Sequence, residues 1–170
     1  MIQFIKIINQ LNEWMGRTSN WIATILMLLI CLDVSMRYIF KFSSVAIYEL
    51  EWHLFSVIFL FGAGYTLKQD KHVRVDIFYS KMSPQKKAMV NLLGYIFFLI
   101  PFCIIIIKGC VPYIKISYLM NEKSTDPGGL TMRYLSKSLI LVGFVFLLLQ
   151  GIAQTFQSIL QLIGKKIDLK

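Results

Sequence analysis

The stretch AMVNLLGYIFFLIPFCIIII, residues 88–107, decides the fold class of this protein. It carries no charged side chain, and its length matches the roughly 20 residues that a helix needs to cross the hydrocarbon core of a bilayer. Pro101 lies inside it and predicts a kink, which neighbouring helices must accommodate. We therefore expect this stretch to be a transmembrane helix.

The rest of the chain has the composition of a membrane protein. Of its 170 residues, 56% are hydrophobic and only 16% are charged, whereas about a quarter of the residues in a soluble domain are charged. The mean hydropathy is +0.64. A soluble domain of this length has no place to bury so many apolar side chains, and disorder is excluded more firmly still. We expect the excess to face lipid.

Three further apolar segments predict spans at about 21–40, 46–67 and 135–158. The loop before the last span contains NEKSTDPGG, residues 121–129, whose Asp-Pro-Gly-Gly is a strong turn signal. We find no internal repeat and no low-complexity tract. The segments indicate an all-α integral membrane protein with one compact four-helix membrane domain over residues 18–170.

Residues 1–17 are amphipathic rather than uniformly apolar. Polar residues recur every three or four positions on one helical face, and apolar residues fall on the other. The polar set is Gln3, Lys6, Gln10, Glu13 and Arg17; the apolar set is Phe4, Ile7, Ile8, Leu11, Trp14 and Met15. This pattern predicts a helix lying in the membrane interface. A cleaved signal peptide is the alternative, but no small-residue cleavage site follows the next apolar run, so we expect the segment in the mature protein.

The charges are dispersed around the spans. The formal net charge is +9, without the basic stripe that nucleic-acid binding requires, so we expect membrane lipids rather than nucleic acid as contacts. The amino-terminal segment, the loop 68–87 and the carboxyl-terminal tail hold 11 Lys and Arg, and the other two loops hold 7. Basic residues favour the cytoplasmic side. Both termini are therefore predicted to be cytoplasmic.

Ionisable residues inside the spans need an explanation, because they are costly in hydrocarbon. Asp33 and Arg37 are spaced i, i+4; we favour a neutralised pair near the span end over an ion or proton relay. Glu49 and His53 share one face of the second span with Ser56, and Glu51 points nearly the opposite way. Glu49 and His53 are either a proton site or packing contacts to another helix, which includes a helix of a partner subunit.

The last span carries a glutamine stripe at Gln150, Gln154, Gln157 and Gln161, with Gly143 on the same face. The deeper pair, Gln150 and Gln154, is expected to face protein, because amides in hydrocarbon need partners and small residues let helices approach. Gln157 and Gln161 are at least as well explained by water on the cytoplasmic side. Residues 62–64, Gly-Ala-Gly, suggest a second close approach.

No catalytic or cofactor motif is present. Two histidines, His53 and His72, are too few for a paired haem site or a zinc site. The three cysteines form no CxxC motif and are expected to be buried small hydrophobic residues. We predict no enzymatic activity, no metal and no cofactor. Four short helices also provide too little protein to enclose a substrate path, unless the chain oligomerises or serves a larger partner.

Several strings carry a family resemblance. They are ELEWHLF (49–55), FLFGAGYTLKQDKHVRVDIFY (59–79), MSPQKK (82–87) and DPGGLTMRYLSKSLILVGFVFLLLQG (126–151). Together and in this order they resemble the small, Q-type membrane subunit of tripartite ATP-independent periplasmic (TRAP) transporters. The resemblance extends from about residue 37 to residue 161 and is strongest to the mannitol and chloroaromatic branch.

The resemblance implies a division of labour in a bacterial inner membrane. A soluble periplasmic protein captures an organic acid, a large permease subunit moves it with sodium, and the small subunit flanks and braces the permease. Sodium coupling is then expected in the permease and not in this chain. A four-helix efflux homo-oligomer is the alternative; it rests on a membrane carboxylate in the first helix, for which Asp33 is the only candidate.

The resemblance also extends to single residues. Glu49 matches a recurrent acidic position at the start of the second span. His72, Arg74 and Asp76 match a loop pattern His-x-Arg-x-Asp, and Arg133 and Lys137 match basic positions that open the last span. The family pattern does not assign these positions a role, and we expect them to be structural or to contact a partner.

Overall fold

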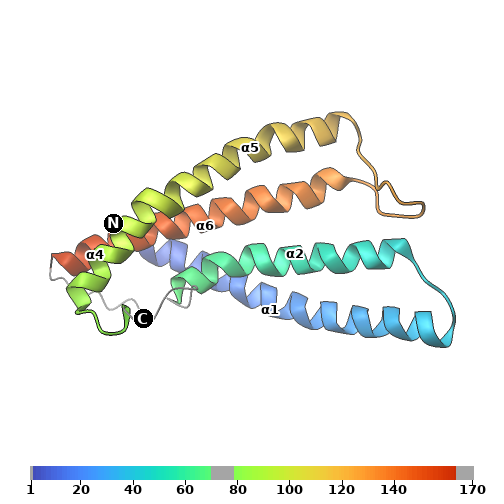
Figure 1. Ribbon diagram of the computed structural model, residues 1–170, viewed down its shortest axis with the longest axis horizontal. Helices are drawn as coiled ribbons and strands as arrows, with labels where there is room; N and C mark the ends of the chain where they lie inside the picture. The colour runs from blue at the N-terminus through green and yellow to red at the C-terminus, as the bar shows by residue number, and fades with distance from the viewer. Residues whose placement is uncertain (1, 70–78, 164–170) are drawn as a thin grey trace.

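The computed structural model describes residues 2–69 and 79–163, and regular structure within them is helical. The helices are α1 (Ile2–Ile39), α2 (Val45–Lys68), α4 (Pro84–Gly94), the π-helical turn Tyr95–Leu99, α5 (Ile100–Leu119) and α6 (Arg133–Leu162). α4, the π turn and α5 form one continuous segment, so the described residues contain 4 helical segments long and apolar enough to cross a membrane (Figure 1). This confirms the predicted all-α membrane fold.

The amphipathic amino-terminal segment and the first span are one helix. α1 contains 38 residues without interruption, although we expected separate elements at 1–17 and 21–40. The polar residues between them are compatible with a helix, because Thr18 and Ser19 donate their hydroxyl hydrogens to the carbonyls of Trp14 and Met15, one turn back. The interfacial position of the segment remains a prediction.

The third segment is longer than the predicted span 88–107 and extends over Pro84–Leu119. Ser83 and Pro84 start it in the usual way: the Ser83 side chain accepts a hydrogen bond from the Lys86 amide, and Pro84 needs no donor in the first turn. Pro101 has no N–H for the preceding turn, and the helix widens into the π turn directly before it. The irregularity expected at Pro101 therefore takes the form of a π turn.

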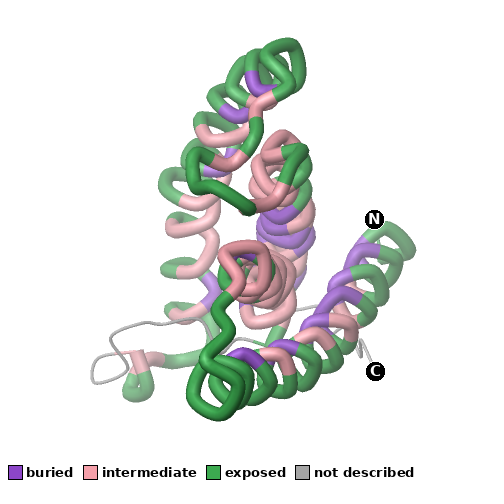
Figure 2. Tube along the Cα trace, turned by 90° about the vertical axis from the view of Figure 1, so that its right-hand side faces the viewer, coloured by how far each residue is buried: buried purple, intermediate pink, exposed green. Residues whose placement is uncertain are grey.

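The four segments form a splayed row at one end of the molecule, where α2 packs between α1 and α6 and α6 packs between α2 and α5. Toward the other end α1 also packs directly against α6. Figure 1 shows the helices close together at the left and apart at the right, and Figure 2 shows the row from its right-hand side. We call these the narrow end and the wide end. The α1–α2 and α5–α6 connections lie at the wide end, and the start of α1 lies at the narrow end.

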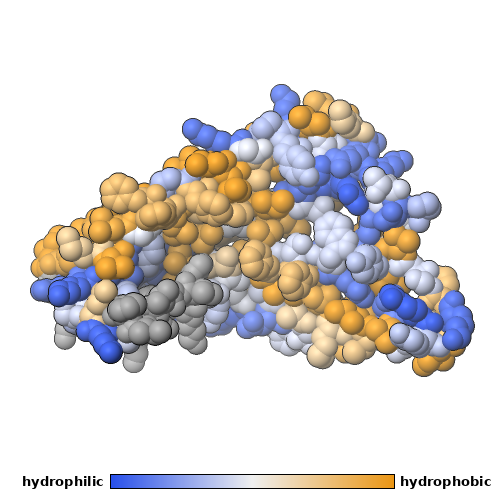
Figure 3. Space-filling model, viewed as in Figure 1, coloured by the Kyte–Doolittle hydropathy of each residue, from blue (hydrophilic) through white to orange (hydrophobic). Residues whose placement is uncertain are grey.

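The buried core is concentrated toward the narrow end. One cluster joins α1 to α6 through Ile5, Ile8, Ala153 and Leu160, and a second joins α2, α5 and α6 through Leu67, Cys103 and Leu147. Elsewhere large apolar side chains are exposed along the helices, and Figure 3 shows them over much of α1 and α5. Such a surface fits a bilayer and not water.

The cysteines differ from one another. Cys103 and Cys110 are buried, as the sequence predicts, but Cys31 is exposed on α1. The prediction is therefore wrong for Cys31, because the buried residues of this part of α1 are Leu26 and Asp33 and helical spacing places Cys31 on another side of the helix.

Polar contact clusters as the candidate functional site

Three side-chain amides, two of them buried and the third, Asn9, half-buried, tie α1 to α6. The Asn12 side-chain amide donates to the Gln150 side-chain oxygen at 2.9 Å and to the Ile8 carbonyl at 3.1 Å. The Gln150 amide donates in turn to the Asn9 side-chain oxygen at 3.0 Å. Asn12 and Gln150 are completely buried. We call Asn9, Asn12 and Gln150 the amide cluster; it supplies the interhelical partners that polar groups in hydrocarbon need.

α2 meets the amide cluster at Gly64. A side-chain carbon at this position would overlap the Asn12 side-chain oxygen, so the contact requires glycine. Gly16 meets the Tyr65 ring, and Gly143 meets Leu60, in similarly close approaches between α1 and α2 and between α2 and α6. Gly62, in contrast, has no neighbouring atom within 4 Å. Of the Gly-Ala-Gly patch, Gly64 therefore makes the close approach.

The glutamine stripe divides as predicted. Gln150 belongs to the amide cluster, and the Gln154 amide lies 3.5 Å from the carbonyl oxygens of Leu67 and Lys68, which end α2. Both carbonyls belong to the last turn of α2, where the regular bonds of the helix run out and side chains can supply donors. Gln157 is half-buried and Gln161 is exposed. The prediction that the deeper pair faces protein is confirmed.

Glu49 anchors the α5–α6 connection to the start of α2. Its carboxylate accepts hydrogen bonds from the Ser124 hydroxyl, from the Leu130 amide at 2.6 Å and from the Arg133 guanidinium at 3.2 Å. Gly128, with φ of +81°, makes the turn, and a side chain at Gly129 would overlap Ser124 and Glu49. We call Glu49, Ser124, Leu130 and Arg133 the glutamate anchor. It satisfies a carboxylate that is only 3% exposed.

A second set of contacts holds the same connection to α6. Glu122 pairs with Lys137, whose ammonium lies 4.0 Å from the centre of the Tyr113 ring. Tyr118 and Tyr134 pack edge to face, with ring centres 5.3 Å apart. The hydrogen bond from Lys137 is the main cause that lowers the pKa of Glu122 below its usual range. The connection is thus fixed at both of its ends.

The remaining predicted residues do not form a shared site. Asp33 is buried and pairs with Arg37, which confirms the predicted pair. The His53 ring contacts the main-chain oxygen of Glu49 and stacks on Trp52, whereas the Glu49 carboxylate bonds the connection. One carboxylate oxygen of Glu51 is buried and has no hydrogen-bond partner among the described groups. His72, Arg74 and Asp76 lie outside the described residues.

The sequence did not reveal the α1 half of the amide cluster. It singled out Glu49 and Arg133 separately, but it revealed neither their pairing nor the Ser124 and Leu130 partners of Glu49. A signal for Asn12 was present: it falls in the stripe Ile5, Ile8, Asn12, Met15 and Ser19, which is buried along one side of α1. A polar residue inside an otherwise apolar stripe points to a buried hydrogen bond. Residues 2–69 and 79–163 contain no group of three His, Cys, Asp or Glu that could hold a metal ion.

Four apolar helical segments joined by buried polar contacts define a multi-pass membrane protein. The family model described as tripartite ATP-independent periplasmic transporters, DctQ component, matches residues 26–161. The chain belongs to this family, which forms the small membrane subunit of TRAP transporters. A search among curated proteins found no match.

The family membership confirms the resemblance to the small subunit of TRAP transporters, and it gives the general function of the chain. The chain is a component of a transporter, and a tripartite transporter implies partner subunits. Members are generally non-catalytic. The mannitol and chloroaromatic branch remains a prediction.

Proposed function

We propose that this chain is a non-catalytic bracing subunit for the large permease of a sodium-coupled, binding-protein-dependent transporter of organic acids. The observation that carries the proposal is the use of its buried polar side chains. Asn12, Gln150 and Glu49 each bond another element of the same chain. They stabilise the packing of the helices, and among residues 2–69 and 79–163 no polar set converges at mid-depth, where secondary transporters build their sites.

The splayed row supports a bracing role. A closed bundle turns one side of every helix inward, but a row leaves two broad faces for other molecules. The helices carry large exposed apolar side chains, among them Trp21, Phe59 and Phe98. The partner permease is proposed to cover part of this surface, with lipid covering the rest. The periplasmic binding protein is the third component.

Reconstitution tests the proposal. Vesicles receive this chain alone, the permease alone or both, with the binding protein and a sodium gradient in every case. We expect no uptake of organic acids by this chain alone and full uptake only when both membrane subunits are present. Uptake by this chain alone would favour the efflux-type alternative. Equal uptake by the permease with and without this chain would reject the bracing role.

Variants of the glutamate anchor separate bracing from ion coupling. Glu49→Ala and Arg133→Ala should reduce the amount of permease recovered with this chain, because the α5–α6 connection loses its anchor. The sodium concentration that gives half-maximal uptake should stay unchanged in the complex that remains. A changed sodium requirement with an intact complex would instead assign these residues to ion coupling.

A further inference from the structure

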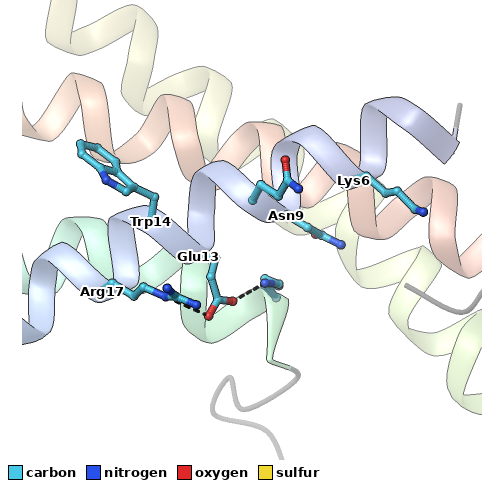
Figure 4. Close-up of a pocket in the computed structure, with 7 residues that line it drawn as sticks. Lys6, Asn9, Glu13, Trp14 and Arg17 are labelled. Atoms are coloured by element: carbon cyan, nitrogen blue, oxygen red, sulfur yellow. Dashed lines mark hydrogen bonds and ion pairs between the residues drawn. The ribbon is translucent and has the colours of Figure 1, made fainter. Parts of the chain in front are cut away.

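A groove of about 370 Å³ runs along α1 at the narrow end, beside the last residue of α2. Its lining includes Lys6, Glu13, Trp14, Arg17 and Lys68. Figure 4 shows Glu13 in the middle of the groove, with dashed lines to its ion-pair partners. Glu13 lies 3.7 Å from the Arg17 guanidinium and also pairs with Lys68.

The groove has an excess of positive charge. Among the described residues that line it, three cations, Lys6, Arg17 and Lys68, face one carboxylate, Glu13. Glu13 is shared by Arg17 and Lys68, and no ion pair joins Lys6 to a described residue. Arg17 is largely exposed, with a side chain that is 75% accessible. The groove therefore keeps capacity for an anion, and a guanidinium and ammonium groups are the donors that bind phosphate.

An apolar stripe lies next to the groove on the same helix. Phe4, Ile7, Leu11 and Trp14 are all exposed, and the spacings of three and four place them on one side of α1. Ile8 and Met15, which the sequence assigned to the same apolar face, are instead buried against protein. α1 thus has three sides: one buried, one apolar and exposed, and one polar. Trp14 belongs to the stripe and also lines the groove.

We propose that this groove binds the phosphate of an anionic membrane phospholipid, with the acyl chains along the apolar stripe. The cations contact the headgroup, and Trp14 lies at the boundary between headgroup and chain, where tryptophan is favoured. A free phosphate ion would bind the cations but would make no contact with the apolar stripe. The combination of groove and stripe selects the lipid as the source of the phosphate.

The test uses the full chain, purified in neutral detergent and titrated with phosphatidylglycerol or phosphatidylcholine, with bound lipid counted by native mass spectrometry. We expect phosphatidylglycerol to bind in preference to phosphatidylcholine. The variant Lys6→Gln/Arg17→Gln should weaken phosphatidylglycerol binding about tenfold, since two cations near the headgroup are lost. The matched control Lys86→Gln/Lys87→Gln removes the same charge from the start of α4, outside the groove, and should bind within about twofold of the unmodified chain.

A second variant works in the opposite direction. Glu13→Gln removes the carboxylate that the described part of the chain contributes to the groove. It should tighten phosphatidylglycerol binding, so the proposal stays testable even if the double variant does not fold. Equal losses in the groove and control variants, or no gain in Glu13→Gln, would overturn it. If glycerol 3-phosphate bound the chain with the same affinity as phosphatidylglycerol and displaced it, the proposal would also be overturned, in favour of a site for free anions.

Discussion

Glu49 illustrates how a carboxylate is kept in a membrane helix. It accepts hydrogen bonds from a hydroxyl, a main-chain amide and a guanidinium, all from the α5–α6 connection and the start of α6. Glu51, two residues further on, has one carboxylate oxygen that is buried without a described partner. The two glutamates stand in one helix and differ mainly in their partners, which makes them a matched pair for mutagenesis.

Glu49→Gln should lower the melting temperature of the chain in detergent by roughly 5 °C. The substitution removes the charge that pairs with Arg133 and turns one acceptor into a donor that faces other donors. Glu51→Gln is the control and should change the melting temperature by less than half as much. Equal effects of the two variants would show that the anchor does not stabilise the fold.

At the scale of elements, glycine positions decide how closely α2 packs against its neighbours. Gly62 and Gly64 flank Ala63 in α2. A side-chain carbon added at Gly64 would overlap an atom of another helix, whereas one added at Gly62 would have no neighbour within 4 Å. The same substitution at the two positions should therefore have opposite effects on stability.

Gly64→Ala should reduce the free energy of unfolding by about 1–3 kcal/mol, because the new methyl group displaces Asn12 from the amide cluster. Gly62→Ala should raise it by up to about 1 kcal/mol, because alanine favours the helix and meets no neighbour. Unfolding in mixed detergent micelles measures both. If Gly62→Ala lowered the free energy of unfolding as much as Gly64→Ala, the described packing of α2 would be contradicted.

The α5–α6 connection should respond to acid through Glu122. Its lowered pKa means that the folded state favours the ionised carboxylate. The pair with Lys137 therefore contributes its full stability above the usual glutamate range and loses it as the pH falls through the lowered pKa. The protection of the amide hydrogens of residues 121–130, measured relative to their intrinsic exchange rates at each pH, should be higher at neutral pH and should fall in this acidic range. Glu122→Gln should remove that step; an unchanged step would assign it to another carboxylate.

At the scale of the whole molecule, the row has two chemically different ends. The narrow end carries the start of α1, the groove and the last residues of α2, and the wide end carries the glutamate anchor. The Lys and Arg count, 11 against 7, predicts that the narrow end is cytoplasmic.

Enzyme fusions measure this orientation. Alkaline phosphatase, which is active only outside the cytoplasm, should be inactive when fused after Lys170 and active when fused near Asp126. A reporter that is active only in the cytoplasm should give the reverse pattern. Activity of both phosphatase fusions, or of the Lys170 fusion alone, would reject the predicted topology.

Spans and local pairs could be predicted from the sequence, but distant partners could not. The apolar segments and the i, i+4 spacing of Asp33 and Arg37 are local signals, and both are confirmed. The bonds from Asn12 to Gln150 and from Ser124 to Glu49 join residues far apart in the chain, so they depend on the order in which the helices pack. The unbroken α1 was missed because a change from polar to apolar composition does not by itself end a helix.

The continuity of α1 has a mechanical consequence. At 1.5 Å per residue its 38 residues measure roughly 57 Å, nearly twice the roughly 30 Å of a hydrocarbon layer. A straight rod of this length either inclines steeply or projects from the layer. We expect a change in bilayer thickness to alter its inclination and the continuous helix to carry that rotation to the end that holds Lys6 and Trp14. α1 would thereby link the thickness of the surrounding membrane to the angle at which its basic end meets the lipid surface.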